Sequence, residues 1–289
     1  MEEKDWYLLK MLYKEKNITK TAEHLYISQP ALTYRIQQLE KEFGIRIVSR
    51  GKKGVEFTSQ GELLVVYAEK MLLELLRVKE MIQNMNDRVE GTLRIGVNSS
   101  FMRYRLPKLL KEFANLYPNV EINVKSGWSS EVINSVYKEE VHVGIFRGDH
   151  HWQEQAFLLS KEPFYIASRD PIDLEDLPNL PRINYKITDY NLRHIIEKWW
   201  HQRFTKPSLI TMEVDSVETC VELIRNGLGF AFVPGISLQD QDTLSTIHLY
   251  SRDGQPIIRE TWMIYRDATL DLSVVKAFVD FMKSRFNTT

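Results

Sequence analysis

One segment limits the possible folds of this chain more than any other, the stretch from residue 59 to residue 89. After Gly61 it contains neither glycine nor proline until Gly91. Its apolar side chains recur at alternating intervals of four and three residues, the spacing of a helix with one continuous apolar stripe. The stripe consists of Leu64, Ala68, Met71, Leu75, Val78, Ile82, Met85 and Val89. The spacing predicts one long helix that separates a short part of the chain from a longer part.

The stripe of this helix needs an apolar partner. A core helix within a single domain would also carry such a stripe. About four heptads, however, exceed the length of a typical globular helix, and so regular a stripe is best covered by a second copy of itself. We therefore predict that residues 59–89 form a linker and dimerisation helix, and that the protein is a homo-oligomer.

The part before this helix, residues 1–58, is predicted to fold into three short helices and a hairpin. Ser28 is a candidate N-cap of the third helix, and Gly44 ends it. The buried stripe of that helix is formed by Leu32, Ile36, Leu39 and Phe43. Two β-prone runs, 45–48 and 55–58, flank the basic tip Arg50-Gly51-Lys52-Lys53-Gly54, which predicts a hairpin.

The charges of the chain are distributed unevenly. The formal net charge of the whole chain is −1. Residues 1–58, however, hold 11 Lys and Arg against 8 Asp and Glu, and the window 26–53 holds 6 against 2. A phosphate backbone would meet this local positive field and not the average over the whole chain.

Two short helices joined by a tight turn and followed by a basic hairpin are typical of a winged helix-turn-helix. Short helix pairs also occur as plain structure, but the basic hairpin and the long helix favour DNA binding here. Side chains at the start of the third helix can reach base edges, and basic ones can bind phosphates. The candidate DNA-binding residues are Ser28, Gln29, Pro30, Thr33, Tyr34, Arg35, Gln37, Arg50, Lys52 and Lys53.

The part after the long helix, residues 92–289, alternates strand-like and helix-like segments. Strands are expected at 92–97, 120–125, 141–146, 164–168, 209–214, 229–233 and 257–265. Helices are expected at 101–117, 131–137, 189–203, 217–226 and 272–286. This alternation predicts an α/β domain with mostly parallel sheets.

Polar side chains gather where these strands end and the next helices begin. Hydroxyls and free backbone N–H groups at such ends bind carboxylates, and arginines can add paired donors. The candidate ligand-binding residues are Ser99, Ser100, Ser129, Ser130, Arg147, Thr219 and Arg259. Any one of these serines alone is more often an N-cap, and either arginine a structural ion pair. Their convergence at strand ends, where open α/β sheets bind ligands, favours an anion site.

No pattern in the sequence indicates catalysis, a metal or a cofactor. The seven histidines are scattered, and no metal-ligand spacing, phosphate-binding glycine loop or nucleophile elbow is present. An enzyme with an unrecognised active site is an alternative, but no nucleophile–base pair in the sequence supports it. The single cysteine, Cys220, and the lack of an export signal or a long apolar run predict a cytoplasmic protein without a membrane partner.

The first part of the chain resembles a known family. The run Thr19–Thr33, continued by Ile36, Leu39, Glu40 and Gly44, is similar to the DNA-binding signature of LysR-type transcriptional regulators. Arg50, Lys53, Thr58 and Gly61 continue the wing part of that signature. Thr21, Tyr34 and Val48 depart from it, which leaves the fold unaffected and the bases that are read undecided.

This resemblance covers the whole chain and implies its organisation. Residues 1–58 would form a winged helix-turn-helix domain, residues 59–89 the linker helix, and residues 92–289 an effector-binding domain like a periplasmic binding protein. Its first subdomain would comprise 92–162 and 266–289, its second 163–265, with the ligand between them. The resemblance also implies a dimer of dimers on double-stranded operator DNA, with RNA polymerase as a further candidate partner. A solute-binding protein that shares the α/β fold is the alternative.

Within that family, the second part of the chain resembles the citrate-responsive catabolite-control regulators of Gram-positive bacteria. The similar runs are Ser126–Glu131, Val141–Gly148, Lys198–Gln202, Val214-Asp215, Glu218–Cys220 and Ile258-Arg259. This resemblance implies a small polycarboxylate effector, with citrate as the first candidate. A LysR-type regulator that senses a different metabolite is the alternative.

Overall fold

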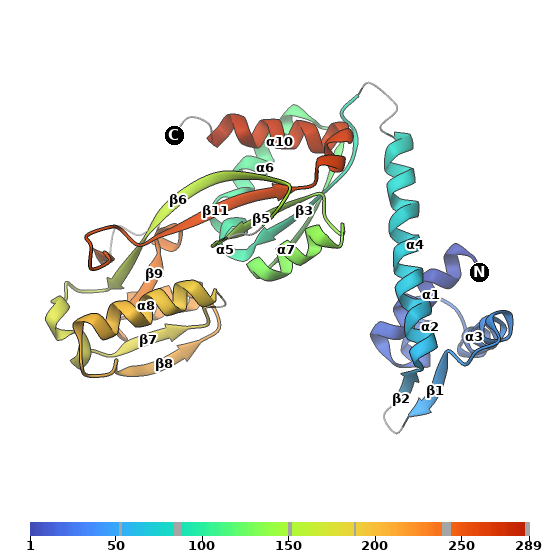
Figure 1. Ribbon diagram of the computed structural model, residues 1–289, viewed down its shortest axis with the longest axis horizontal. Coiled ribbons are helices and arrows are strands. Elements are labelled where there is room, and N and C mark those ends of the chain that lie inside the picture. Colours follow the sequence, from blue (N-terminus) through green and yellow to red (C-terminus); the bar gives the residue numbers. More distant parts are fainter. Residues whose placement is uncertain (52–53, 84–87, 150–151, 188, 239–243, 287–289) are drawn as a thin grey trace. The chain divides into compact units, whose positions relative to one another are not determined.

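A computed structural model describes residues 1–51, 54–83, 88–149, 152–187, 189–238 and 244–286 (Figure 1). The chain divides into two compact units, Met1–Met85 and Asn86–Thr289, and each is described by itself. No helix in these ranges is long and apolar enough to cross a membrane.

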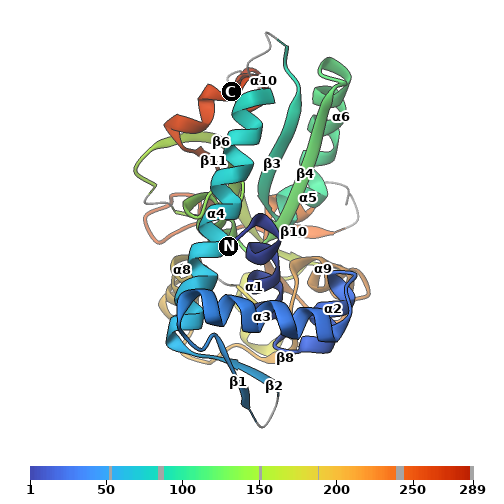
Figure 2. The ribbon, with the colours of Figure 1, turned by 90° about the vertical axis from the view of Figure 1, so that its right-hand side faces the viewer.

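The first unit is a three-helix domain with a hairpin and one long helix. Figure 2 shows the three short helices beside the first half of the long one. The helices are α1 (Glu3–Glu15), α2 (Ile18–His24), α3 (Gln29–Phe43) and α4 (Ser59–Gln83), and the strands are β1 (Val48–Gly51) and β2 (Gly54–Phe57). Leu9, Leu12, Leu32, Leu39 and Ala68 are completely buried where α1, α3 and α4 meet.

Helix α3 has the ends that its capping residues predict. Ser28 Oγ accepts a hydrogen bond from the Ala31 backbone N–H at 3.4 Å, and Gly44 ends the helix with φ 65°. Three residues of the expected stripe are buried, but Phe43 is 41% exposed. The prediction that Phe43 belongs to the buried stripe was wrong, because the core ends one turn before the helix does.

The hairpin strand β1 begins at Val48, three residues later than expected. Glu40 Oε1 accepts hydrogen bonds from the backbone N–H groups of Ile47 at 2.8 Å and Val48 at 3.3 Å. This carboxylate holds the start of the hairpin against α3, so the ladder with β2 begins only at the pair Val48 and Phe57.

The stripe of α4 has two different surroundings along its length. Leu64 and Ala68 pack into the core of the first unit, whereas Val78 and Ile82 are 50% and 60% exposed. Met85 lies outside the described residues. Val89 packs against the core of the second unit, which corrects its assignment to the stripe. The first part of the stripe therefore packs within the chain, and the later part forms an exposed apolar face.

The first subdomain of the second unit is a five-stranded mixed sheet in the order β4-β3-β5-β11-β6. Its strands are β3 (Gly91–Asn98), β4 (Val120–Gly127), β5 (Val143–Arg147), β11 (Ile258–Tyr265) and the first part of β6 (Gln155–Ser168). Helices α6 (Leu106–Leu116) and α10 (Ser273–Phe286) cover one face and α7 (Ser129–Tyr137) the other (Figure 1). Phe113 and Phe278 meet edge to face in the larger of the two cores.

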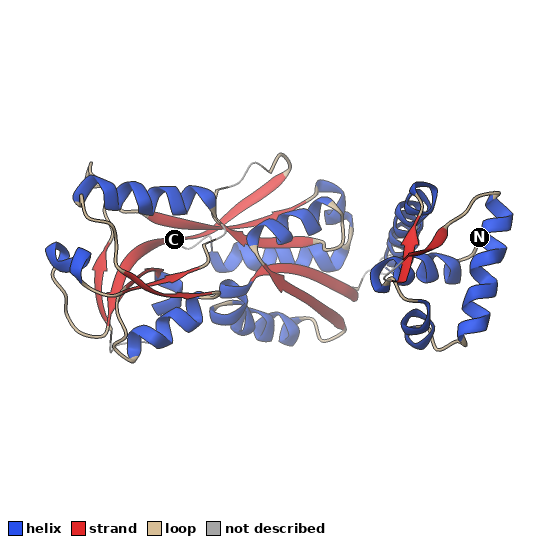
Figure 3. Ribbon diagram, turned by 90° about the horizontal axis from the view of Figure 1, so that it is seen from below, coloured by secondary structure: helices blue, strands red, loops and turns tan. Residues whose placement is uncertain are grey.

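The second subdomain is built on the rest of β6. This strand pairs with β9 (Ala231–Pro234) and β10 (Ser245–His248), and a bridge from Phe230 to Arg182 joins them to β7 (Arg182–Tyr185) and β8 (Ile210–Val214). Helix α8 (Tyr190–Arg203) buries Trp199 and Trp200 on one face, and α9 (Val217–Arg225) buries Cys220 on the other. Figure 3 shows the strands between flanking helices. Short 3-10 turns lie at Leu174–Asn179, Gly235–Leu238 and Asp267–Asp271.

The expectation of mostly parallel sheets was wrong. Strands β3, β4 and β5 are parallel, as are β7 and β8, but β11 runs antiparallel to β5 and β6, and β6 antiparallel to β9 and β10. The strands β6 and β11 carry the chain from the first subdomain to the second and back again. They therefore run in opposite directions beside each other.

Two further expectations need correction. The helix expected over 101–117 is two helices, α5 (Ser99–Tyr104) and α6, because Pro107 has no N–H with which to continue the first. Met263 and Tyr265, assigned from the sequence to the second subdomain, lie in the core of the first. The cause is again β11, which pairs with β5 along its second half.

Candidate nucleic-acid interface and ligand pocket

The start of α3 presents an exposed polar face. Gln29, Pro30, Tyr34 and Gln37 are exposed there, as expected from the sequence. The hydroxyl of half-buried Thr33 donates to the Gln29 carbonyl at 3.0 Å and so faces its own helix. The phenol of Tyr34 accepts a hydrogen bond from Gln38 Nε2 at 2.7 Å. Amide, phenol and prolyl groups of this kind can reach base edges in a groove.

Arg35 has a partner inside its own domain. Its Nε and Nη2 donate to the two carboxylate oxygens of Asp5 at 2.6 and 2.7 Å, and Asp5 is 1% exposed. Burial opposes ionisation of Asp5, but the hydrogen bonds from Arg35 and from the Glu2 N–H hold its pKa below the ordinary value. This pair joins α3 to α1, and two of the five guanidinium N–H donors are used in it.

The turn between α2 and α3 exposes one residue that the sequence did not single out. Tyr26 is 96% exposed and adopts φ 54°, the left-handed region. Ser28, two residues later, is exposed and caps α3. An aromatic side chain in a turn has no periodic pattern around it, so its exposure could be learned only from the fold.

Two close backbone approaches fix the hairpin, one near its tip and one at its base. The Val55 N–H donates to the Lys16 carbonyl at 3.0 Å, and a Cβ on Gly54 would lie 2.6 Å from that oxygen. A Cβ on Gly61 would lie 2.1 Å from the Ile47 carbonyl oxygen. These contacts require glycine at both positions. The Arg50 side chain and the residues Lys52 and Lys53 at the tip lie outside the described part of the chain.

A pocket of about 230 Å³ lies between the two subdomains of the second unit. Four residues expected at a ligand site line it: Ser99, Ser100, Arg147 and Arg259. The other lining residues are Asn98, Trp128, Tyr185, Lys186, Ile187, Asp215, Ser216, Val217, Glu218 and Pro234. The site thus draws on the ends of β3, β5 and β7, on β11 and on the start of α9.

The remaining expected residues stand behind or beside this lining. Ser129 Oγ donates to the Arg147 carbonyl at 3.0 Å and accepts from the Arg147 N–H at 3.1 Å and from Asn98 Nδ2 at 3.3 Å. It therefore fixes the backbone of Arg147. Ser130 is exposed, and the exposed Thr219 hydroxyl lies 3.0 Å from Ser216 Oγ. Within the described chain, the lining does not include these three residues.

Both arginines of the pocket already have partners. Arg147 is 3% exposed, and its Nη2 donates to Glu162 Oε2 at 2.6 Å. Burial lowers the pKa of its guanidinium to about 10. Arg259 Nη2 lies 3.4 Å from the Arg147 carbonyl oxygen and 3.5 Å from Asp189 Oδ2. Glu162 and Asp189 had no counterpart in the sequence reasoning, because they lie 15 and 70 residues along the chain from the arginines they meet.

The pocket also carries acidic groups on the side of the second subdomain. Ser100 Oγ lies 3.5 Å from Glu218 Oε1, and this contact spans the two subdomains. Burial raises the pKa of the Tyr185 hydroxyl, and this neutral phenol can donate a hydrogen bond to a ligand. Hydroxyls, guanidinium groups and one ammonium group face two carboxylates here, an arrangement suited to a polar ligand that bridges both subdomains.

Comparison with known proteins identifies the family. Residues 4–62 match the bacterial regulatory helix-turn-helix proteins of the lysR family, and residues 86–287 match the LysR substrate-binding domain. The chain belongs to the LysR family. It is accordingly a LysR-type DNA-binding transcriptional regulator with an effector-binding domain.

Two relatives of this LysR-type regulator occur in Bacillus subtilis (strain 168). The uncharacterized HTH-type transcriptional regulator YraN is 47% identical over 283 residues, which covers 98% of each chain. The uncharacterized HTH-type transcriptional regulator YkuM is 35% identical over 285 residues, or 98% of this chain and 97% of that one.

Solved structures share the fold of this LysR-type regulator at low sequence identity. Full-length CbnR with its target DNA matches with a TM-score of 0.70 at 17% identity, over 98% of this chain and 99% of that one. Full-length BenM matches with a TM-score of 0.56 at 23% identity, over 99% and 97%. These matches concern the fold of the two units and not their ligands.

Proposed function

We propose that this LysR-type regulator binds dyad-symmetric operator DNA as a dimer of dimers in the bacterial cytoplasm, and that a small polycarboxylate controls this binding. Citrate is the first candidate effector. RNA polymerase is the further partner that a regulator at a promoter would contact. The protein is proposed to act without catalysis and without a cofactor.

The observation that carries the effector proposal is the convergence of Arg147, Arg259 and Lys186 on one pocket lined by both subdomains. A compact ligand with several carboxylates needs cationic and hydroxyl donors from more than one direction. The hydroxyls of Ser99 and Ser100 line the same space. Arg147 is committed to Glu162, so Arg259, whose contacts with Asp189 and the Arg147 carbonyl are longer, is the better direct partner for a ligand carboxylate.

The proposed mechanism follows from the two-subdomain architecture. A ligand that touches both walls favours the closed arrangement, since it gains contacts there that the open one lacks. Among the strands in the described part of the chain, β6 and β11 alone cross between the subdomains as a pair, which suits a hinge. Closure would change how the second units pack in the oligomer, and hence the spacing of the DNA-binding domains along the operator.

The DNA-binding part of the proposal rests on the exposed start of α3. Gln29, Tyr34 and Gln37 are the candidate base-reading side chains there, with Tyr26 beside them in the turn. The open apolar face of α4 around Val78 and Ile82 supports the proposed dimer. Two such domains, related by a twofold axis, suit a palindromic site.

Calorimetry of the full-length protein with citrate tests the effector. We expect saturable binding to wild type, and Arg259→Gln should weaken it about 30-fold or more, since one charged partner is lost. Arg169→Gln is the matched control, because Arg169 is exposed and paired with Asp170 away from the pocket lining. No binding heat with citrate, together with saturable binding of an uncharged metabolite, would contradict the polycarboxylate assignment.

A further inference from the structure

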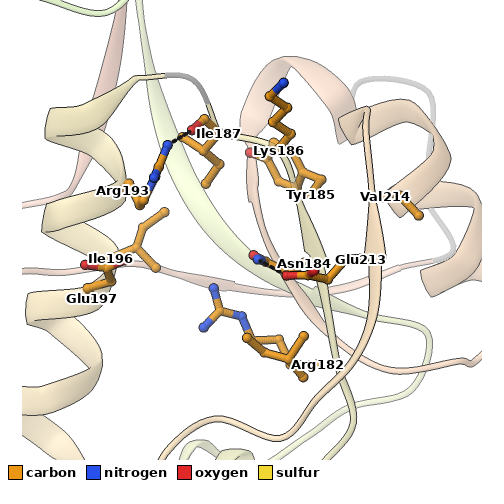
Figure 4. Close-up of a pocket in the computed structure, with 11 residues that line it drawn as sticks. Arg182, Asn184, Tyr185, Lys186, Ile187, Arg193, Ile196, Glu197, Glu213 and Val214 are labelled. Carbon is orange, nitrogen blue, oxygen red and sulfur yellow. Dashed lines mark hydrogen bonds between the residues drawn. The ribbon is translucent and has the colours of Figure 1, made fainter.

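A second and larger cavity lies within the second subdomain. Its volume is about 500 Å³, and it opens between α8 and the paired strands β7 and β8 (Figure 4). Small-molecule pockets in proteins commonly have volumes of about 300–1,000 Å³. Four lining residues determine which ligand this cavity can bind. They are the cation Arg182 and the apolar residues Ile196, Ile210 and Val214.

Arg182 has no ion-pair partner among the described residues, although the carboxylate of Glu197 in the same lining attracts it from a longer distance. Among the described residues, Nε of Arg182 is buried without a hydrogen-bond partner, and no carboxylate forms an ion pair with the guanidinium. Burial lowers the pKa of this group to about 10. Its other close contact is the ring of Phe232, whose centroid lies 4.6 Å from the guanidinium carbon. A desolvated charge of this kind is costly until an anion pairs with it.

The other charged groups of the cavity have contacts of their own or lie at its mouth. Arg193 Nη2 donates to the Ile187 carbonyl at 2.7 Å, and Glu213 accepts from Asn184 Nδ2 at 3.4 Å. Glu197 is exposed on α8. Figure 4 shows the guanidinium of Arg182 directed into the space between α8 and the strands, and Lys186 directed away from it. Arg182 is therefore the inward-facing charge.

The rest of the lining is apolar on both sides of Arg182. Ile196 of α8 is 2% exposed, while Ile210 at the start of β8, also in the lining, is 46% exposed. An exposed isoleucine beside a cavity gains free energy when a ligand covers it, at about 25 cal/mol for each Å² of apolar surface. The complementary ligand thus has one anionic end and an apolar body.

We propose that this cavity binds a small monocarboxylate with an apolar body, its carboxylate paired with Arg182 and its body against Ile196, Ile210 and Val214. This site is separate from the polycarboxylate site proposed above. It lies within one subdomain, whereas that pocket lies between two.

The two pockets share one wall. Tyr185, Lys186 and Ile187, the segment that follows β7, line both of them. A ligand that fixes this segment from one side changes the free energy of ligand binding on the other, and the coupling is reciprocal. The second site is accordingly a place where an apolar carboxylate would tune the response to the first effector.

Binding of benzoate and hexanoate to the full-length protein tests the proposal, with benzamide and hexanamide as neutral analogues. We expect at least one of the two acids to bind, and its amide to bind at least 10-fold more weakly, since a charge-assisted pair is lost. Arg182→Gln should weaken binding of that acid about 30-fold, and Arg182→Lys by less, because the charge is kept. Arg203→Gln, on α8 over Trp199 and outside this lining, should leave it unchanged.

Thermal melting without ligand separates a binding role from a structural one. If Arg182 serves the ligand, Arg182→Gln melts at the same temperature as wild type or higher, because an unpaired buried cation has been removed. A lower melting temperature together with unchanged affinity for the acid would assign Arg182 to the fold and overturn the proposal. Equal affinities for the acid and its amide would also overturn the proposal. The same holds if neither acid binds at a ligand concentration of about 10 mM, since the Kd would then be too high for a specific site. Arg259→Gln should lose citrate and keep the monocarboxylate, so the two proposals fail separately.

Discussion

Asp5 shows how one buried carboxylate organises the DNA-binding domain. It accepts two hydrogen bonds from Arg35 and one from the Glu2 N–H at 2.6 Å, so it fixes the start of α1 and the middle of α3 at once. The position of α3 relative to α1 therefore depends on an ion pair, and not only on apolar packing.

Arg35→Gln should destabilise this domain. The buried Asp5 carboxylate would lose its charged donors, at a cost of about 2 kcal/mol. Hydrogen exchange of the α1 and α3 amides measures this locally, apart from the second unit. Lys41→Gln is the control, since Lys41 is exposed on the same helix. Unchanged protection of α1 and α3, with operator affinity reduced, would instead make Arg35 a phosphate contact.

The same pair predicts a pH dependence with a definite sign. The pKa of Asp5 is lower in the folded state than its ordinary value of about 4. Its contribution to stability is therefore complete above that value and is lost as the pH falls through the lower, folded value. The difference in α1 and α3 protection between wild type and Asp5→Asn should be constant from about pH 7 to 5 and shrink below about pH 4. A difference that grows on acidification would contradict this assignment.

At the scale of elements, the long helix α4 has two roles along one stripe. Its first turns belong to the core of the DNA-binding domain, because Leu64 and Ala68 are buried against α1. Its last described turns expose apolar side chains to the extent of 50% at Val78, 58% at Met81 and 60% at Ile82. A monomer would leave this face in water, so the element itself favours pairing.

Val78→Asp should dissociate the dimer without unfolding the domain. In the monomer the side chain is half exposed and a carboxylate is tolerated, whereas in a dimer seam it would be desolvated at a cost of several kcal/mol. Light scattering and sedimentation measure the assembly, and far-ultraviolet circular dichroism the helix content. Lys70→Asp, off the stripe and exposed, should keep the oligomer. Leu64→Asp, in the intrachain core, should unfold the domain; an intact dimer for Val78→Asp would refute the seam.

The elements that sequence patterns predicted well are those with local determinants. The ends of α3 follow from Ser28 and Gly44, two residues that cap their own helix. The directions of β6 and β11 did not follow, because strand direction depends on partners more than 90 residues away in the chain. Arg147 and Arg259 were predicted at the pocket from their places on apolar strands. Their contacts with Glu162 and Asp189, and that of Ser100 with Glu218, were not predicted, because they depend on how separate elements fold together.

At the scale of the whole molecule, function requires the two units to act on one equilibrium. The first unit offers the exposed face of α3 and the second offers a pocket between subdomains. The long helix α4 ends the first unit, and residues 88–90 lead into the second without regular structure. A ligand can alter operator binding only if it favours one arrangement of the oligomer over another.

Salt dependence of operator binding tests this picture, because phosphate contacts release counter-ions and base contacts do not. The double variant Lys52→Ala with Lys53→Ala should lower affinity for operator and for random DNA alike, and reduce the slope of log K against log salt by about 2 if both lysines bind phosphates. Gln29→Ala should leave that slope unchanged and narrow the difference in affinity between operator and random DNA, if the amide on the exposed face of α3 reads bases as proposed. Fluorescence anisotropy at several salt concentrations measures the slope and the two affinities. Citrate added at fixed salt should change the affinity for operator DNA and leave the affinity for random DNA unchanged. If the lysine variant kept the slope, the hairpin tip would lie away from the phosphates, and the basic residues 50–53 would have no part in the interface.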